Sequence, residues 1–173
     1  MLKSLGLAAL LTLSAPLAVQ AQAAKINDAQ IAHIAYTAGT IDIAAGKQAL
    51  AKSHDKAVLD FAKEMVRDHS AVNDQALALV KKLGVTPQDN PTSQALSKDA
   101  AGKLASLGKL SGAAFDKAYL ANEVAFHKTV NGALSATLIP NAKNAELKSL
   151  LQTGLKLFSE HQTHAEHLAA GLK

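Results

Sequence analysis

Apolar residues recur at spacings of three and four along four long segments of the chain, which is the pattern of helices with one buried face. The first segment covers residues 28–53 and the second covers 55–83. The third covers residues 112–138 and the fourth covers 142–171. No segment shows the alternation of apolar and polar residues that is typical of a strand. The pattern therefore predicts an all-α protein.

Residues that begin and end helices agree with these segments. Asn27 and Asp55 each precede an apolar stripe and can cap the free amides of a first turn. Gly84 follows the second helix, as a helix-ending glycine does. Pro140 is expected to end the third helix, and Asn141 can then cap the fourth.

The connection between the second and third long helices, residues 84–110, is long enough to run the length of a bundle. It contains a weaker helical stretch at about residues 93–107. Two helical hairpins joined by one long crossover form the ferritin-like arrangement, in which the second and third long helices are parallel. We therefore predict a ferritin-like four-helix bundle with a long crossover between helices 2 and 3. An up-and-down bundle with an elaborate loop is the alternative.

Four polar residues interrupt the apolar stripes where a core residue is expected: Asp42, His69, His127 and His161. Each lies near the middle of its own helix, and a shift of four residues moves a side chain only about 6 Å along a helix axis. The four side chains can therefore meet at one level inside a bundle. A buried polar group without a partner costs roughly 1–3 kcal/mol, so these residues need one another, water or a metal ion.

Three imidazoles and a carboxylate suit a first-row transition-metal ion such as Zn, Fe, Mn, Co or Cu(II). Glu123 precedes His127 by four residues, so it can be a further ligand or can accept a hydrogen bond from an imidazole. The sequence thus predicts a metal site of Asp42, His69, Glu123, His127 and His161, with the identity of the metal open. The alternative is a metal-free hydrogen-bonded network that fixes the register of the helices.

The motifs of several other functions are missing from the sequence. Di-iron carboxylate bundles carry Glu-x-x-His motifs, whereas Glu123 and Glu160 are followed by histidine at the fourth position, not the third. The chain has no cysteine and two methionines, which argues against a Cu(I) store. We identify no catalytic residue, and the sequence leans against an enzyme without excluding one.

The other polar residues near these positions are interpreted as surface residues. His164 and His167 follow the histidine of the fourth helix at intervals of three and turn toward solvent. Glu64 and Asp68 flank His69 on the second helix and point partly outward.

The first 23 residues have the pattern of a signal peptide. Lys3 gives a positive start, residues 5–19 form an apolar run, and small residues mark cleavage after residue 21 or 23. No later segment has the length of a membrane span. We therefore expect a signal peptide at 1–23 and one domain at 24–173, exported to the periplasm or elsewhere in a bacterial envelope.

Basic residues are scattered along the chain, which has a formal net charge of +4. Removal of the signal peptide with Lys3 leaves +3. Proteins that bind nucleic acids normally combine clustered lysines and arginines with stacking aromatic residues, but aromatic residues make up only 3% of this chain. The partner expected from the sequence is a metal ion and not a nucleic acid, and the sequence identifies no protein partner.

Four stretches of the chain resemble an exported bacterial family known as domain of unknown function 4142. They are TAGTIDIAAGKQAL (37–50), VLDFAKEMVRDHSAVN (58–73), GAAFDKAYLANEVAFHKTV (112–130) and LKLFSEHQTHAEHL (155–168). The resemblance implies a ferritin-like fold, an envelope location, and histidines at the positions of His69, His127 and His161. The family often has Leu-Pro where this chain has Leu155-Lys156. It implies no established activity.

Together, these patterns support the hypothesis of a periplasmic ferritin-like bundle that binds a metal ion in its middle, with a role in envelope metal handling or stress. The second hypothesis is a non-catalytic interaction module of the envelope whose polar core is purely structural.

The signal sequence predicts that the first 21 or 23 residues are removed on export. The intact mass of protein isolated from the periplasm should show this loss. Full-length protein recovered from the cytoplasm would contradict the prediction.

Overall fold

The computed structural model describes residues 26–172, which are helical almost throughout. The helices are α1 (Asp28–Lys52), α2 (Lys56–Lys82), α3 (Pro91–Gly108), α4 (Gly112–Ala133) and α6 (Ala145–Gly171), with a π-helix η1 (Leu134–Leu138) and a short turn α5 (Ile139–Asn141) between the last two. No strand occurs among residues 26–172, so the all-α class is confirmed. None of the helices in this range is long and apolar enough to span a bilayer. The predicted signal peptide, residues 1–23, lies outside the described residues.

The first two helices begin at the predicted caps. Asn27 and Gln30 form a capping box: the Asn27 side chain accepts from the Gln30 amide at 2.9 Å, and the Gln30 side chain accepts from the Asn27 amide at 3.1 Å. Asp55 begins α2 by accepting a hydrogen bond from the Ala57 amide at 2.8 Å. These local bonds fix where the two helices start, and so which faces they turn toward each other.

The third long helix ends later than predicted. Pro140 does not stop it, because helical backbone continues through η1 and α5 to Asn141. In η1 the amide of Ile139 donates to the carbonyl of Leu134, which is the wider π pattern. A proline ring normally clashes with the carbonyl four residues earlier, and a wider turn gives that ring room. The cap of α6 is consequently Asn144, and the predicted cap at Asn141 is wrong.

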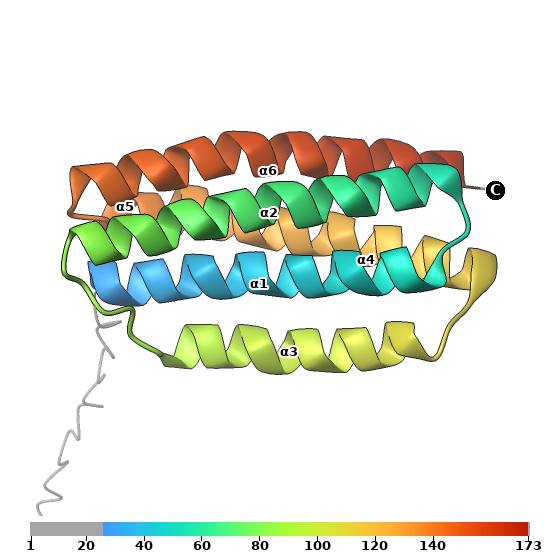
Figure 1. Cartoon of the computed structure of the whole chain (residues 1–173), viewed down its shortest axis with the longest axis horizontal. Helices are drawn as coiled ribbons and strands as arrows, with labels where there is room; N and C mark the ends of the chain where they lie inside the picture. Colours follow the sequence, from blue (N-terminus) through green and yellow to red (C-terminus); the bar gives the residue numbers. More distant parts are fainter. Residues whose placement is uncertain (1–25, 173) are drawn as a thin grey trace, which may run out of the picture.

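α1, α2, α4 and α6 lie side by side along one axis, with α3 outside α1 (Figure 1). α1 and α2 form one antiparallel hairpin, and α4 and α6 form another. The chain crosses the length of the molecule through α3, so α2 and α4 run in the same direction (Figure 1). The weaker helical stretch predicted at about residues 93–107 is α3, a helix of 18 residues with its own capping box at Asn90, so the described residues form five helices of 18 residues or more and not four.

Hydrogen bonds hold α3 against α1. The Gln48 side chain donates to the carbonyl of Leu104 at 3.0 Å, and the Lys52 ammonium donates to the carbonyl of Gly108 at 3.0 Å. Gly108 is the last residue of α3, where carbonyl groups have no partner within the helix, and Leu104 lies one turn earlier. The crossover is therefore fixed at that end by polar contacts.

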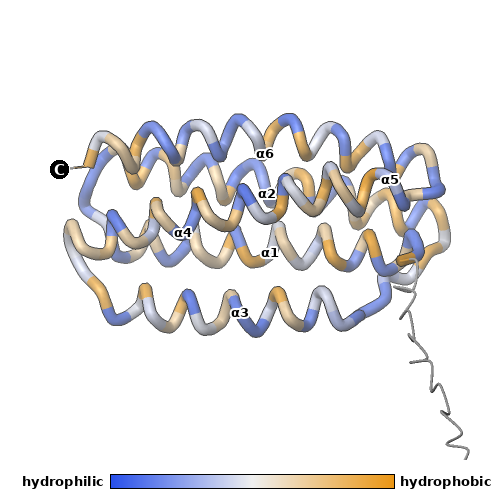
Figure 2. The backbone as a smooth tube through the Cα atoms, turned by 180° about the vertical axis from the view of Figure 1, so that it is seen from behind, coloured by the Kyte–Doolittle hydropathy of each residue, from blue (hydrophilic) through white to orange (hydrophobic). Residues whose placement is uncertain are grey.

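Buried apolar side chains form two separate cores, one in each half of the molecule. Hydrophobic and hydrophilic residues alternate along each helix, as expected for helices with one buried face (Figure 2). The first core consists of Ala45, Ala49, Val58, Phe61, Ala62, Met65, Leu107, Phe115, Tyr119, Leu120 and Ala165. The second core consists of Ile31, Ala32, Ile34, Leu134, Leu138, Ala142, Leu147, Leu151 and Phe158. On α1, α2, α4 and α6 the residues between the two cores include buried polar side chains.

Close packing of α1 on α2 predicts that Gly46 cannot be replaced without cost. A Cβ atom at Gly46 would lie 2.9 Å from Cγ2 of Val66 and 3.1 Å from the backbone carbonyl oxygen of Ala62. Gly46→Ala should lower the free energy of unfolding by about 1–3 kcal/mol, because overpacking pushes the two helices apart. Gly132→Ala is the control, since a Cβ atom at that position would have no heavy atom within 4 Å, and it should raise stability by about 0.5–1 kcal/mol. Urea unfolding followed by circular dichroism measures both, and equal effects would contradict the prediction.

Candidate metal centre

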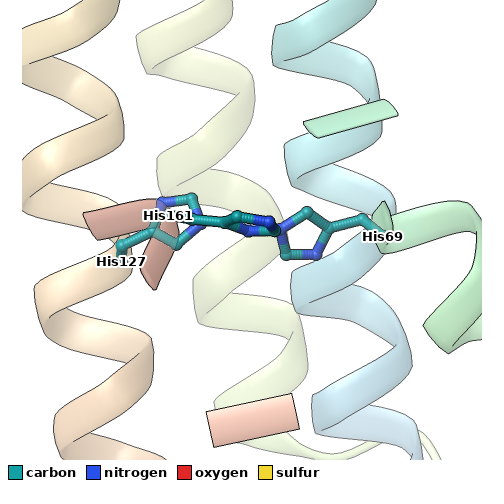
Figure 3. A group of neighbouring side chains, drawn as sticks. All are labelled: His69, His127 and His161. Carbon is teal, nitrogen blue, oxygen red and sulfur yellow. The ribbon is translucent and has the colours of Figure 1, made fainter. Parts of the chain in front are cut away.

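The five predicted ligands converge between the two apolar cores. Asp42 comes from α1, His69 from α2, Glu123 and His127 from α4, and His161 from α6. Each of these residues is at most 3% exposed. Figure 3 shows the three imidazole rings pointing toward one another at one level between the helices. The sequence places each of these residues near the middle of its helix, and the packing of the helices brings the five side chains together.

The three imidazoles surround a common point. The ring centroids of His69 and His161 are 5.3 Å apart, and each is 5.6 Å from the centroid of His127. One nitrogen atom from each ring lies within 4.8 Å of the corresponding atoms of the other two. A single ion placed among them can be reached by all three rings.

Two carboxylates complete the cluster. Oδ2 of Asp42 lies 3.0 Å from Nε2 of His69 and 3.4 Å from Nε2 of His127. Oε2 of Glu123 lies 3.8 Å from Nδ1 of His127. Asp42, Glu123 and His127 also each offer one ligand atom within 4.8 Å of the others. The carboxylates are therefore neighbours of the imidazole group, with His127 common to both.

The outer nitrogen atoms of two imidazoles are fixed by acceptors. Nδ1 of His127 lies 3.0 Å from the backbone carbonyl oxygen of Glu123, and a carbonyl oxygen can only accept, so Nδ1 carries the proton. Nε2 of His161 lies 3.1 Å from Oδ2 of Asp68. Donation to these acceptors leaves the lone pairs of Nε2 on His127 and Nδ1 on His161 directed into the cluster. Protein histidines that bind metal ions are commonly oriented by such an outer acceptor.

Asp68 is held in its accepting form by Arg67. The guanidinium of Arg67 donates to the two carboxylate oxygens of Asp68 at 2.6 and 2.9 Å. These hydrogen bonds are the main reason that the pKa of Asp68 is lowered, and the bond to His161 lowers it further. An ionised Asp68 accepts a hydrogen bond from the Nε2–H group of His161 and so selects the tautomer with a free lone pair on the inner nitrogen, Nδ1.

Several buried atoms of the cluster have no hydrogen-bond partner: Oδ1 of Asp42, both ring nitrogens of His69, Oε2 of Glu123, Nε2 of His127 and Nδ1 of His161. The Nε2 of His69 is near Oδ2 of Asp42, but the two groups are not aligned as a hydrogen bond. Burying such atoms without a partner is costly. The Asp42 and Glu123 carboxyls can satisfy each other by sharing the proton that burial favours on Glu123, so the four imidazole nitrogens are the atoms left without a partner.

Burial sets the charges of the cluster. Desolvation lowers the pKa of His69 to about 4, in spite of the opposing effect of Asp42. Desolvation likewise lowers the pKa of His161. For Glu123, burial first and the neighbouring Asp42 second raise the pKa well above its usual range. Without a cation, burial therefore favours the neutral forms of His69, His161 and Glu123.

Sequence reasoning missed two residues that act on the cluster. The sequence pattern indicates a surface position for Asp68, whereas its carboxylate contacts and orients His161. Phe158 stacks on His69 with the ring centroids 4.5 Å apart and the planes 14° apart. In the sequence, only the position of Phe158, one turn before His161 on the same apolar stripe, points to this stacking. The contact of Asp68 joins α2 to α6, and no pattern within either helix predicts such a contact.

Glu64 and His164, which the sequence predicts to be surface residues, contact each other just outside the contact between Asp68 and His161. Nδ1 of His164 lies 2.8 Å from Oε2 of Glu64, and both side chains are partly exposed. Glu64 also offers an oxygen within 4.8 Å of ligand atoms on Asp68 and His161. The interpretation of His164 as a solvent-facing residue agrees with its exposure, whereas Glu64 lies at the outer edge of the cluster.

Comparison with known proteins identifies one family. Residues 13–168 match the family described as "Domain of unknown function (DUF4142)". None of the curated proteins matches the chain, and neither does any solved structure.

The lowered pKa of His69 predicts a loss of stability in acid. Between pH 6.5 and about 4 the unfolded chain binds a proton at this imidazole and the folded chain does not, so acidification favours unfolding. In chelator-treated protein, this residue should contribute a loss of roughly 2–4 kcal/mol between pH 7 and pH 4.

Urea unfolding at both pH values, compared between wild type and His69→Gln, measures that contribution. The exposed His167→Gln serves as the control and should retain the dependence on pH shown by the wild type. A His69→Gln variant with the same dependence would refute the assignment.

Proposed function

We propose that this chain, which belongs to the family described as domain of unknown function DUF4142, binds one transition-metal ion between its two apolar cores. The proposed ligands are His69, His127, His161 and Asp42, with Glu123 as a fifth donor or as an acceptor beside them. Three imidazoles and one or two carboxylates suit Zn, Fe, Mn or Cu(II).

The spacing of the donor atoms is the observation that carries the proposal. Two ligands that are each 2.0–2.2 Å from one ion, at tetrahedral or octahedral angles, lie about 3–3.5 Å from each other. Oδ2 of Asp42 lies 3.0 and 3.4 Å from the Nε2 atoms of His69 and His127. These separations are those of two ligands of one ion, and the unpartnered lone pairs are those that an ion would use.

A divalent ion would also resolve the charges of the site. Asp42 and Glu123 are buried side by side, and Glu123 keeps a proton because of that burial and the adjacent carboxylate. A divalent ion supplies two positive charges, which allows both carboxylates to ionise. The neutral imidazoles that burial favours are the form that binds a metal.

We place this site in an exported protein. In this proposal residues 1–23 are a signal peptide, and residues 24–173 are a ferritin-like four-helix bundle made by α1, α2, α4 and α6, with α3 as part of the crossover. The location is the periplasm or another part of the bacterial envelope, and the role is metal handling or protection against stress. Because no catalytic residue is assigned, the function proposed is binding and not a reaction.

One observation favours a second function. Asp42 lies close to imidazoles from α2 and α4, and Asp68 of α2 contacts His161 of α6, so polar contacts join all four long helices without an ion. A protein with this structural network alone would be a non-catalytic interaction module of the envelope.

Thermal unfolding in the presence of metal separates the two functions. The chelator-treated wild type should gain about 2.7 kcal/mol of stability at a metal concentration one hundred times the dissociation constant, because the ion binds only the folded chain. Zn(II), Mn(II), Fe(II) and Cu(II) are tested in turn. His161→Ala should abolish the gain, whereas His167→Ala on the same helix should keep it.

A structural network predicts a different result. The wild type would then show no metal-dependent shift, and His161→Ala would lose about 1–3 kcal/mol because its partners are left without hydrogen bonds. Loss of metal binding in His167→Ala, with binding kept in His161→Ala, would place the site near the end of α6.

A further inference from the structure

A cavity of about 570 Å³ lies within the second core, beside the candidate metal centre. Its walls come from α1, α2, α4, η1 and α6, and α3 covers one side. Many of the positions that face it carry small residues, so no side chain fills the space. The small lining residues include Ala35 and Ala38 of α1, Ala76 of α2 and Ala133 of α4.

The cavity is apolar. Its larger lining residues are mainly leucine, isoleucine, valine and phenylalanine, and the charged residue among the described lining residues is Asp99 of α3, beside Leu96. The amide of Asn73, also in the wall, already donates toward the Tyr36 carbonyl and the Thr40 hydroxyl. Apolar cavities hold water poorly and take up apolar molecules. The chemistry of the wall therefore selects an apolar occupant.

The shape of the cavity is elongated along the helices. On α6 the lining runs from Leu147 to Phe158, about 16 Å at 1.5 Å per residue, and on α3 it runs from Pro91 to Asp99, about 12 Å. The volume falls in the range of roughly 300–1,000 Å³ that is usual for small-molecule sites. An α-helix with its side chains is about 10–12 Å across and cannot enter between the helices that form the wall. A single unbranched chain fits this form better than a compact ring system.

The cavity has an outlet between α3 and α4. Leu96, Asp99 and Thr129 line both the cavity and an adjoining groove of about 510 Å³ that reaches the surface. Lys103 lines that groove, and Lys98 lies with it and Asp99 along the exposed side of α3. The charged residues that line the groove are Asp99 and Lys103, so their charges balance, and Lys98 adds an ammonium group on the adjoining surface of α3. A carboxylate head group can remain in water beside Lys103 while its chain lies inside.

Phe158 connects this cavity to the imidazole cluster. Its ring forms part of the cavity wall and stacks on His69 at a centroid distance of 4.5 Å. A molecule inside the cavity would therefore contact the residue that packs directly on a candidate ligand.

We propose that this cavity binds the chain of one fatty acid, with the methylene groups among the small residues of the second core and the carboxylate in water beside Lys103. This site is distinct from the candidate metal centre and shares only the Phe158 wall with it. The binding requires no metal ion, so its test and that of the metal site can fail separately.

Titration calorimetry of the mature chain after chelator treatment, with laurate and dodecanol as probes, tests the proposal. Laurate should bind with one site per chain, and dodecanol should bind more weakly because it lacks the carboxylate. Ala76→Phe puts a large side chain into the cavity and should weaken laurate binding by about tenfold or more. Ala78→Phe, an exposed change on the same helix, should leave it unchanged. Contacts in nuclear magnetic resonance spectra between laurate methylene protons and the Ala76 and Ala133 methyl groups of the wild type provide a readout that does not depend on folding of the variants.

Each result decides the question. Binding of one laurate with contacts to Ala76 and Ala133 supports the proposal, and equal binding of dodecanol would overturn the placement of the carboxylate beside Lys103. Absence of saturable binding of either probe, or contacts confined to the outer groove, would overturn it. A variant Ala76→Phe that is folded and binds laurate as the wild type does would overturn it as well.

Discussion

The buried polar layer between the two apolar cores is the constraint on which the rest of this structure depends. Four helices each bring one or two polar side chains to the same level, where water is largely excluded. A group that is neither solvated nor hydrogen-bonded there is costly, and a charged group without a counter-charge costs more. The helices can therefore pack closely only in a register that lets Asp42, Glu123 and the three histidines serve one another or a common ion. Apolar cores on both sides then shield the cluster.

The residues around the cluster matter as much as those within it. The carbonyl of Glu123 and the carboxylate of Asp68 accept hydrogen bonds from the outer N–H groups of His127 and His161, so the lone pairs of the inner nitrogens are free and directed into the cluster. Arg67 keeps Asp68 ionised and therefore able to accept. Such preorganisation lowers the cost of binding. The exposed Arg67 therefore contributes to the geometry of the buried site through Asp68.

The second core gives the molecule a different property. Small residues on facing helices leave an elongated apolar space, whereas the first core is filled by large side chains such as Phe61, Phe115 and Tyr119. Phe158 stands at the border, with its ring against both His69 and the cavity. The polar cluster and the apolar cavity thus meet at the ring of Phe158. A change in the position of this ring would affect both the cavity and His69.

The sequence by itself determined the helices and the level of the cluster, because helical periodicity and capping are local and four polar residues break four apolar stripes at similar depth. It also located Asp42, His69, Glu123, His127 and His161. It did not determine that the crossover holds a full helix packed on α1, or that helical backbone passes Pro140 through a π turn. The role of Asp68 and the cavity beside Phe158 were also hidden. These features depend on how side chains from separate helices meet and on which spaces remain unfilled, and only the tertiary structure decides both.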